Sequence, residues 1–80
     1  MIESMEKIIE ILRDIRPGVD WETAAAIIDD GIIDSFDMIS LVSELNEAFG
    51  VRIELEHIEA ENFNSVAAIS ALLEKLGAGI

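Results

Sequence analysis

Three stretches of the chain repeat apolar residues at the spacing of an amphipathic α-helix. Charged residues occupy the opposite face of the first stretch. The apolar positions are Ile2, Met5, Ile8, Ile9, Leu12 and Ile15 in the first stretch, Met38, Ile39, Leu41, Val42, Leu45, Ala48 and Phe49 in the second, and Val66, Ile69, Leu72, Leu73 and Leu76 in the third. The pattern predicts three long helices.

The ends of these helices carry residues that commonly start or stop a helix. Proline disfavours helix at the residue before it, and glycine leaves the helical conformation readily. Serine and asparagine side chains cap helix N-termini. The residues concerned are Pro17 and Gly18 after the first stretch, Gly50 after the second, Asn64 or Ser65 before the third, and Lys75 and Gly77 at its end. The sequence therefore predicts where each helix begins or ends.

The two connections between the helices have different patterns. Residues 19–34 form a long loop that carries Trp21 and two isoleucine pairs, and apolar side chains of this kind are needed to hold such a loop in place. In the second connection Val51, Ile53 and Leu55 alternate with charged residues, which is a period typical of a strand. No second strand is available to pair with it. We therefore predict an extended connector whose apolar side chains fill the core.

The size and composition fit one small helical domain. Eighty residues suffice for a single core, and an apolar content of 51% favours folding over disorder. With a short helical turn around residues 58–61, the pattern yields three main helices and one short one, whose apolar stripes can be buried only against one another. We predict an all-α fold with residues 1–80 as a single domain.

Acidic residues dominate the charge of the chain. Asp and Glu number 17 against 5 Lys and Arg, and the net charge of -12 argues against nucleic acid as a partner. Such a surface is steered toward basic patches on partner proteins, although solubility alone explains it equally well. The chain has no cysteine, which excludes a disulfide framework, and no apolar run long enough for a membrane span. We expect a cytoplasmic protein.

A polar cluster lies where the second helix begins, in the run Asp30-Gly31-Ile32-Ile33-Asp34-Ser35-Phe36-Asp37. The simplest interpretation is a helix cap, with Asp34 capping the first turn and Asp37 reaching back. A second is that Ser35 carries a phosphodiester near the backbone N–H groups of that turn. A third, a serine nucleophile, lacks a G-x-S-x-G elbow, and His57 is the only histidine in the sequence. From the residues alone, the cap is the best supported.

The run from Gly31 to Asp37 resembles the acyl carrier protein family around its phosphopantetheine-attachment serine. The resemblance spans nearly the whole chain and includes the long loop, the length and the acidity. It is carried further by Ile39, Leu41, Val42, Glu44, Leu45, the Phe49-Gly50 pair, Ile53 and the Phe63-x-Ser65-Val66 step. In register with the predicted helices, the match favours a modified serine over a simple cap.

The resemblance implies a four-helix bundle in which a phosphopantetheinyl transferase modifies Ser35, using coenzyme A and magnesium. The product carries 4'-phosphopantetheine, whose thiol holds a cargo as a thioester, while the protein itself has no catalytic residue and no metal of its own. The implied partners are acyl- or aminoacyl-loading and condensing enzymes with basic docking patches, and a monomer is expected. The implied docking residues are Asp34, Phe36, Asp37, Met38, Glu44 and Glu47.

Three positions depart from the commonest pattern of fatty-acid carriers. Phe36 replaces the usual leucine, Ser40 replaces a glutamate, and Met38 is bulkier and more apolar than the usual residue. These positions flank the arm, so a D-alanyl or peptidyl carrier that works with an adenylating enzyme is the close alternative. An acidic helical adaptor without a prosthetic group is the alternative from a different class.

Three other features have structural interpretations. Trp21 is expected to plug the core or anchor the loop, because an indole buries a large apolar area. His57 stands beside a carboxylate and is expected to be partly solvated. The Asp29-Asp30 pair can hold a divalent cation only loosely, because Ala26 lies where an EF-hand requires its first carboxylate.

Overall fold

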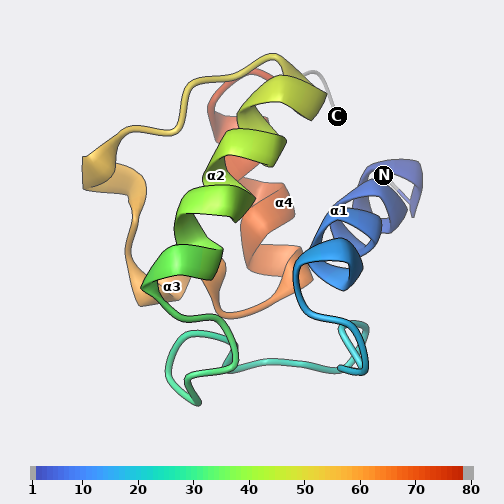
Figure 1. Ribbon diagram of the computed structural model, residues 1–80. Helices are drawn as coiled ribbons and strands as arrows, with labels where there is room; N and C mark the ends of the chain where they lie inside the picture. The colour runs from blue at the N-terminus through green and yellow to red at the C-terminus, as the bar shows by residue number, and fades with distance from the viewer. Residues whose placement is uncertain (1, 79–80) are drawn as a thin grey trace.

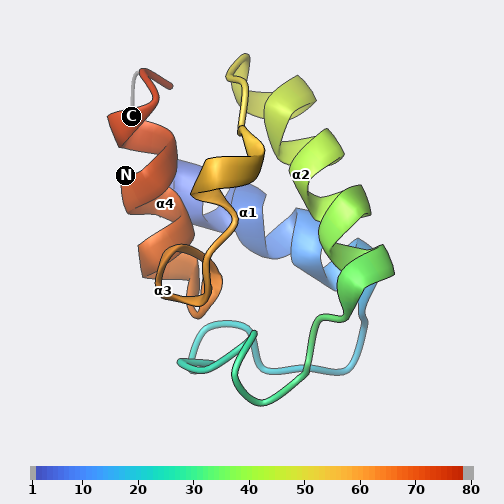
Figure 2. The same cartoon turned by 90° about the vertical axis from the view of Figure 1, so that its left-hand side faces the viewer.

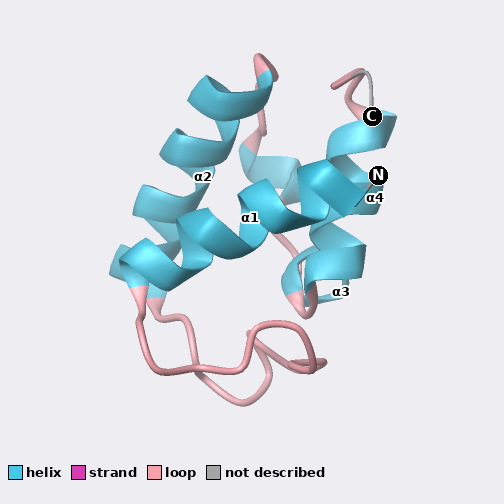
Figure 3. Ribbon diagram, turned by 90° about the vertical axis from the view of Figure 1, so that its right-hand side faces the viewer, coloured by secondary structure: helices cyan, strands magenta, loops and turns pink. Residues whose placement is uncertain are grey.

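The computed structural model describes residues 2–78, with side chains from Met5 onward. The helices in this part of the chain are α1 (Ile2–Ile15), α2 (Ser35–Phe49), the 3-10 helix η1 (Leu55–His57), α3 (Ala60–Phe63) and α4 (Val66–Lys75) (Figure 1). No strand occurs between residues 2 and 78 (Figure 3). The all-α prediction is therefore confirmed.

The three long helices share one interior. α1 packs against both α2 and α4, and α3 packs against α4. The long loop closes the end of the bundle at which α2 begins (Figure 1). The connector after α2 returns along that helix toward α3 (Figure 2). This arrangement is the predicted bundle of three long helices and a short one.

A single set of buried side chains joins the helices, the long loop and the connector. Burying one such side chain fully is worth about 1.5–3 kcal/mol relative to leaving it exposed, so this set supplies most of the stabilisation. Its members are Ile8, Ile11, Leu12, Trp21, Ile27, Ile33, Leu41, Leu45, Ile53, Phe63, Val66, Ile69, Leu72 and Leu73.

The helix ends follow the sequence closely. Gly50 ends α2 in the left-handed conformation, with φ of 64°, which costs glycine little because it has no Cβ. At the start of α4 the Ser65 hydroxyl accepts a hydrogen bond from the backbone N–H of Ala68 at 3.1 Å. Ser65, rather than Asn64, is therefore the N-cap of this helix.

The long loop is held by its own apolar side chains, as predicted. Trp21 is only 2% exposed, and its indole Nε1–H donates to the backbone carbonyl of Arg16 at 3.2 Å. Ile27 and Ile33 are buried in the core. Because these three side chains are anchored, a loop without regular secondary structure has a defined path to Ser35.

The connector after α2 is extended and unpaired, but one detail of its prediction is wrong. Ile53 fills the core as expected, whereas Leu55 is 84% exposed because it begins η1 and turns away from the bundle. The short helix predicted around residues 58–61 forms as α3, which begins at Ala60, and η1 precedes it. The side chain of His57 accepts a hydrogen bond from the Glu54 N–H at 3.0 Å, which stabilises η1. Phe63 is fully buried, so α3 is anchored in the core.

Candidate functional site

Ser35 is the first residue of α2, and it is exposed to solvent. Asp34 precedes it as the N-cap, and its Oδ1 accepts a hydrogen bond from the backbone N–H of Asp37 at 2.8 Å. The first turn of a helix also presents unpaired backbone N–H groups and the positive end of the dipole. The capping role predicted for Asp34 is confirmed, and the neighbouring Ser35 is exposed.

Asp37 was predicted to reach back to the cap, but the backbone of Asp34 is only a minor partner of its carboxylate. Its Oδ2 instead accepts a hydrogen bond from Nη2 of Arg16, at 2.7 Å. This hydrogen bond, supported by the charge of Arg16, lowers the pKa of Asp37, and the same hydrogen bond raises the pKa of Arg16. The pair links the residue after α1 to the first turn of α2. Arg16 was not expected at this site, because 21 positions separate it from Asp37 in the chain.

An apolar groove lies directly beside Ser35. It has a volume of about 490 Å³, within the range of small-molecule sites. Asp34 and Ser35 supply its polar lining. The apolar lining comes from the long loop, from α2 and from the segment between η1 and α3, through Ile28, Ile33, Met38, Ile39 and Ile58. Met38, predicted as a docking residue, is half-buried and faces this groove.

The other predicted docking residues fall into two groups along α2. Phe36 lies beside Ser35 and is 81% exposed, and Asp34 and Asp37 share this first turn. Glu44 and Glu47 are also exposed, but they line a separate depression that contains Lys7 of α1. The structure therefore places the six residues on one helix and its cap without bringing them into one patch.

Two exposed apolar residues were not predicted, and one of them, Ile39, lines the groove. Ile39 of α2 is 68% exposed and Leu55 of η1 is 84% exposed. Ile39 matches the helical repeat, but Leu41 and Leu45 make up the buried part of α2, and Ile39 lies off that face. In the sequence, Ile39 can be recognised as an apolar residue at a helix position outside the stripe of Leu41 and Leu45.

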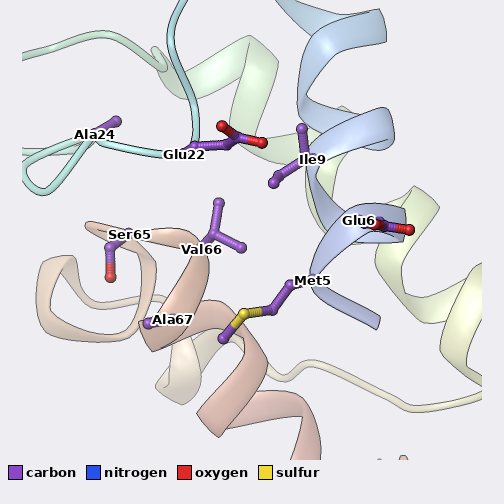
Figure 4. Close-up of a pocket in the computed structure, with 8 residues that line it drawn as sticks. All are labelled: Met5, Glu6, Ile9, Glu22, Ala24, Ser65, Val66 and Ala67. Carbon is purple, nitrogen blue, oxygen red and sulfur yellow. The ribbon is translucent and has the colours of Figure 1, made fainter. Parts of the chain in front are cut away.

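A second hollow lies between α1, the long loop and the start of α4 (Figure 4). Its volume is about 340 Å³, and Ser65, Glu6 and Glu22 are among the residues that line it. Ser65 is a weaker candidate than Ser35 for modification, because its hydroxyl caps α4 and it is only partly exposed. We therefore assign no modification site to this hollow.

A protein-family model described as a phosphopantetheine attachment site matches residues 6–73, which is most of the chain. The chain belongs to this family. Comparison with curated proteins and with solved structures gives no match. Members of the family carry covalently attached 4'-phosphopantetheine, so the chain is a phosphopantetheine carrier domain.

The carrier has the features that such a group requires. An exposed serine begins α2, and an apolar groove lies beside it. The arm supplies a thiol, which this cysteine-free chain lacks. Carrier domains of this family do not catalyse reactions themselves, and they interact with modifying and acyl-handling enzymes.

The described part of the carrier has neither a metal-binding cluster nor a membrane-spanning helix. Over residues 2–78, no group of three or more histidine or acidic side chains is placed to hold a metal ion. The Asp29 carboxylate instead accepts a hydrogen bond from the Asn64 side chain at 3.1 Å. Among the helices described, none is both long and apolar enough to cross a membrane.

Proposed function

We propose that Ser35 carries 4'-phosphopantetheine and that the chain is an acyl carrier. The supporting observation is that an exposed serine at the first position of α2 borders an apolar groove. Ser40 and Ser43 are exposed on the same helix, but they do not line this groove. In this proposal residues 1–80 act as one monomeric, cytoplasmic carrier domain that catalyses nothing.

The arm is attached in one phosphoryl transfer from coenzyme A. The Ser35 hydroxyl oxygen forms a bond to the phosphorus that bears the pantetheine. The bond from this phosphorus to the adenosine 3',5'-bisphosphate leaving group breaks, and the hydroxyl proton passes to the transferase. A phosphopantetheinyl transferase supplies the magnesium. Arg16 partly neutralises Asp37, which reduces the negative charge that the new phosphodiester meets in the first turn.

An acyl cargo suits the groove better than an aminoacyl cargo. Its non-polar lining consists of three isoleucines from outside α2, together with Met38 and Ile39. Each methylene buried there stabilises the bound chain by about 0.8 kcal/mol, or about fourfold in the equilibrium constant. The ammonium group of a D-alanyl cargo loses hydration on entering the groove, where Asp34 is the one carboxylate of the lining and the apolar side chains offer no partner.

Partner enzymes dock on α2. The exposed first turn presents Phe36 next to Ser35, so the docking patch of a partner needs an apolar surface as well as positive charge. Asp34, Glu44 and Glu47 supply negative charge along the same helix. Met38 contributes from the groove. The role of Asp37 is reduced, because its carboxylate is already bound by Arg16.

The carrier function is tested by intact-mass measurement after incubation with coenzyme A, magnesium and a broad-specificity transferase. The parent chain and the matched control Ser40→Ala are expected to gain one phosphopantetheine, and Ser35→Ala none. A well-folded parent chain that gains nothing would contradict the proposal and favour the acidic adaptor. Modification of Ser35→Ala would place the arm on another residue.

The cargo class is tested on the modified chain charged with either an octanoyl or a D-alanyl group. We expect the octanoyl group to shift the methyl resonances of Ile28, Met38 and Ile58, and the D-alanyl group to leave them near their uncharged positions. Unshifted methyls in the octanoyl form, with efficient charging by an adenylating enzyme, would favour the D-alanyl or peptidyl carrier instead.

A further inference from the structure

The segment Asn62-Phe63-Asn64 joins the two sides of the groove through the short helix α3. Phe63 is fully buried, which fixes this segment in the core. The asparagine side chains on either side of it make hydrogen bonds to two different parts of the chain. Asn62 and Asn64 therefore extend from a rigid anchor.

Asn64 binds the long loop through four hydrogen bonds, which we call the Asn64 clasp. Its side-chain Oδ1 accepts from the backbone N–H groups of Ile28, at 2.9 Å, and Asp29, at 3.1 Å. Its Nδ2 donates to the Asp29 carboxylate at 3.1 Å. Its backbone carbonyl accepts from the N–H of Ile27 at 2.9 Å. The clasp joins residues that lie 35 or more positions apart in the sequence.

The clasped part of the loop forms one side of the groove and leads directly to Ser35. Ile28, whose N–H is bound by Asn64, lines the groove. The carbonyl of Ile27 accepts from the N–H groups of Ile32 at 3.0 Å and Ile33 at 3.4 Å, which closes residues 27–33 into a turn. Ile33 also lines the groove, and Asp34 and Ser35 follow it.

Asn62 holds the opposite side. Its Nδ2 donates to the backbone carbonyl of His57 at 2.9 Å. The next residue, Ile58, lines the groove across from the loop. The two asparagines thus fix both non-helical sides of the groove to α3, whereas Met38 and Ile39 of α2 form the remaining side.

We propose that Asn64 is a positioning residue for the cargo, with Asn62 as its counterpart. The Asn64 clasp holds Ile28 in place and so determines how well the groove shields an acyl chain on the Ser35 arm from water. This inference rests on the proposed function. Loss of the clasp frees the loop side of the groove, while the buried Ile27 and Phe63 keep the bundle folded.

The clasp itself is tested on the unmodified chain by amide hydrogen exchange in Asn64→Ala. We expect faster exchange at Ile28 and Asp29, by roughly fivefold or more, because each amide loses an ordinary hydrogen bond. The amide of Ile27 bonds to the backbone of Asn64, so it serves as an internal reference. A uniform increase at Ile27 and throughout the core would indicate global destabilisation and contradict a local clasp.

Two further variants separate positioning from general stability. The double variant D29N/N64D keeps a side-chain oxygen at position 64 for the two backbone N–H groups and reverses the donor and acceptor of the side-chain hydrogen bond. It should therefore restore slow amide hydrogen exchange at positions 28 and 29. Asn46→Ala is the matched control. Asn46 accepts from the Ile53 N–H at 2.9 Å in the same way, but it lies near the other end of α2 and does not line the groove.

The cargo role is measured as the rate at which hydroxylamine cleaves an octanoyl thioester, relative to an acetyl thioester on the same variant. In the parent chain, in Asn46→Ala and in the double variant D29N/N64D, we expect the octanoyl thioester to be cleaved more slowly than the acetyl thioester. In Asn64→Ala we expect the two cleavage rates to converge. Asn62→Ala should change the ratio in the same direction. An unchanged ratio in Asn64→Ala would overturn the inference. A parent chain that accepts no arm contradicts the proposed function instead, and this is detected before any variant is charged.

Discussion

α2 and α4 lie in the same core, but they use their apolar residues differently. α4 is 10 residues long and buries four side chains, Val66, Ile69, Leu72 and Leu73. α2 is 15 residues long and buries only Leu41 and Leu45. Two of its large apolar side chains, Phe36 and Ile39, are exposed beside Ser35.

The difference assigns separate tasks to the two helices. Exposed large apolar residues that cluster near one polar site often mark contacts with ligands or partners. The large apolar residues of α4 are buried in the core, and the hydroxyl of its N-cap residue, Ser65, accepts a hydrogen bond from the Ala68 N–H. We infer that α4 is scaffold, whereas the first turn of α2 is available for chemistry and docking.

The largest expected effect comes from the core of α4. Leu73→Ala removes a fully buried side chain, and we expect a loss of about 2–5 kcal/mol in the free energy of unfolding. Phe36→Ala, on exposed α2, should change that free energy by less than about 0.5 kcal/mol but raise the KM of partner enzymes. Urea unfolding measures the first quantity. A large stability loss in Phe36→Ala would remove the contrast between the helices.

The two N-caps give an effect of intermediate size. Asp34→Ala and Ser65→Ala each remove a side-chain cap, and each should cost about 1 kcal/mol of stability. Only Asp34→Ala should also slow modification by the transferase, because Asp34 precedes Ser35. Equal modification rates for the two variants would show that the cap of α2 has no role beyond stability.

The smallest effect concerns the ion pair between Arg16 and Asp37. The hydrogen bond from Arg16 lowers the pKa of Asp37, so its contribution to stability is present above about pH 4 and is lost as the pH falls through the lowered pKa. Arg16 is exposed and Asp37 is partly exposed, so salt should weaken the pair. In Arg16→Gln we expect an NMR titration to give a higher pKa for Asp37. An unchanged value would mean that the pair is not formed in solution.

Local signals in the sequence predicted much of the fold and the position of Ser35. Apolar spacing predicted the long helices, and Asp34 and Gly50 mark the ends of α2 because caps depend on residues close in sequence. Trp21 was also placed correctly, since an indole in a loop is stabilised most by burial.

Contacts between distant segments were not predictable in this way. The pairing of Asp37 with Arg16, and the hydrogen bonds of Asn64 to the long loop, depend on how an irregular loop folds back. Leu55 was wrongly assigned to the core because its alternation with charged residues suggested one inward face, whereas the backbone turns at Glu54 to start η1. Periodicity does not reveal such a turn.

We propose that Ser35, the first residue of α2, carries the arm. The most direct test is fragment-mass analysis of the chain after modification with coenzyme A and a transferase. We expect the fragment containing Ser35 to bear the phosphopantetheine and fragments containing Ser40, Ser43 or Ser65 to lack it. Phosphopantetheine on any of these other serines, with Ser35 unmodified, would contradict the proposal.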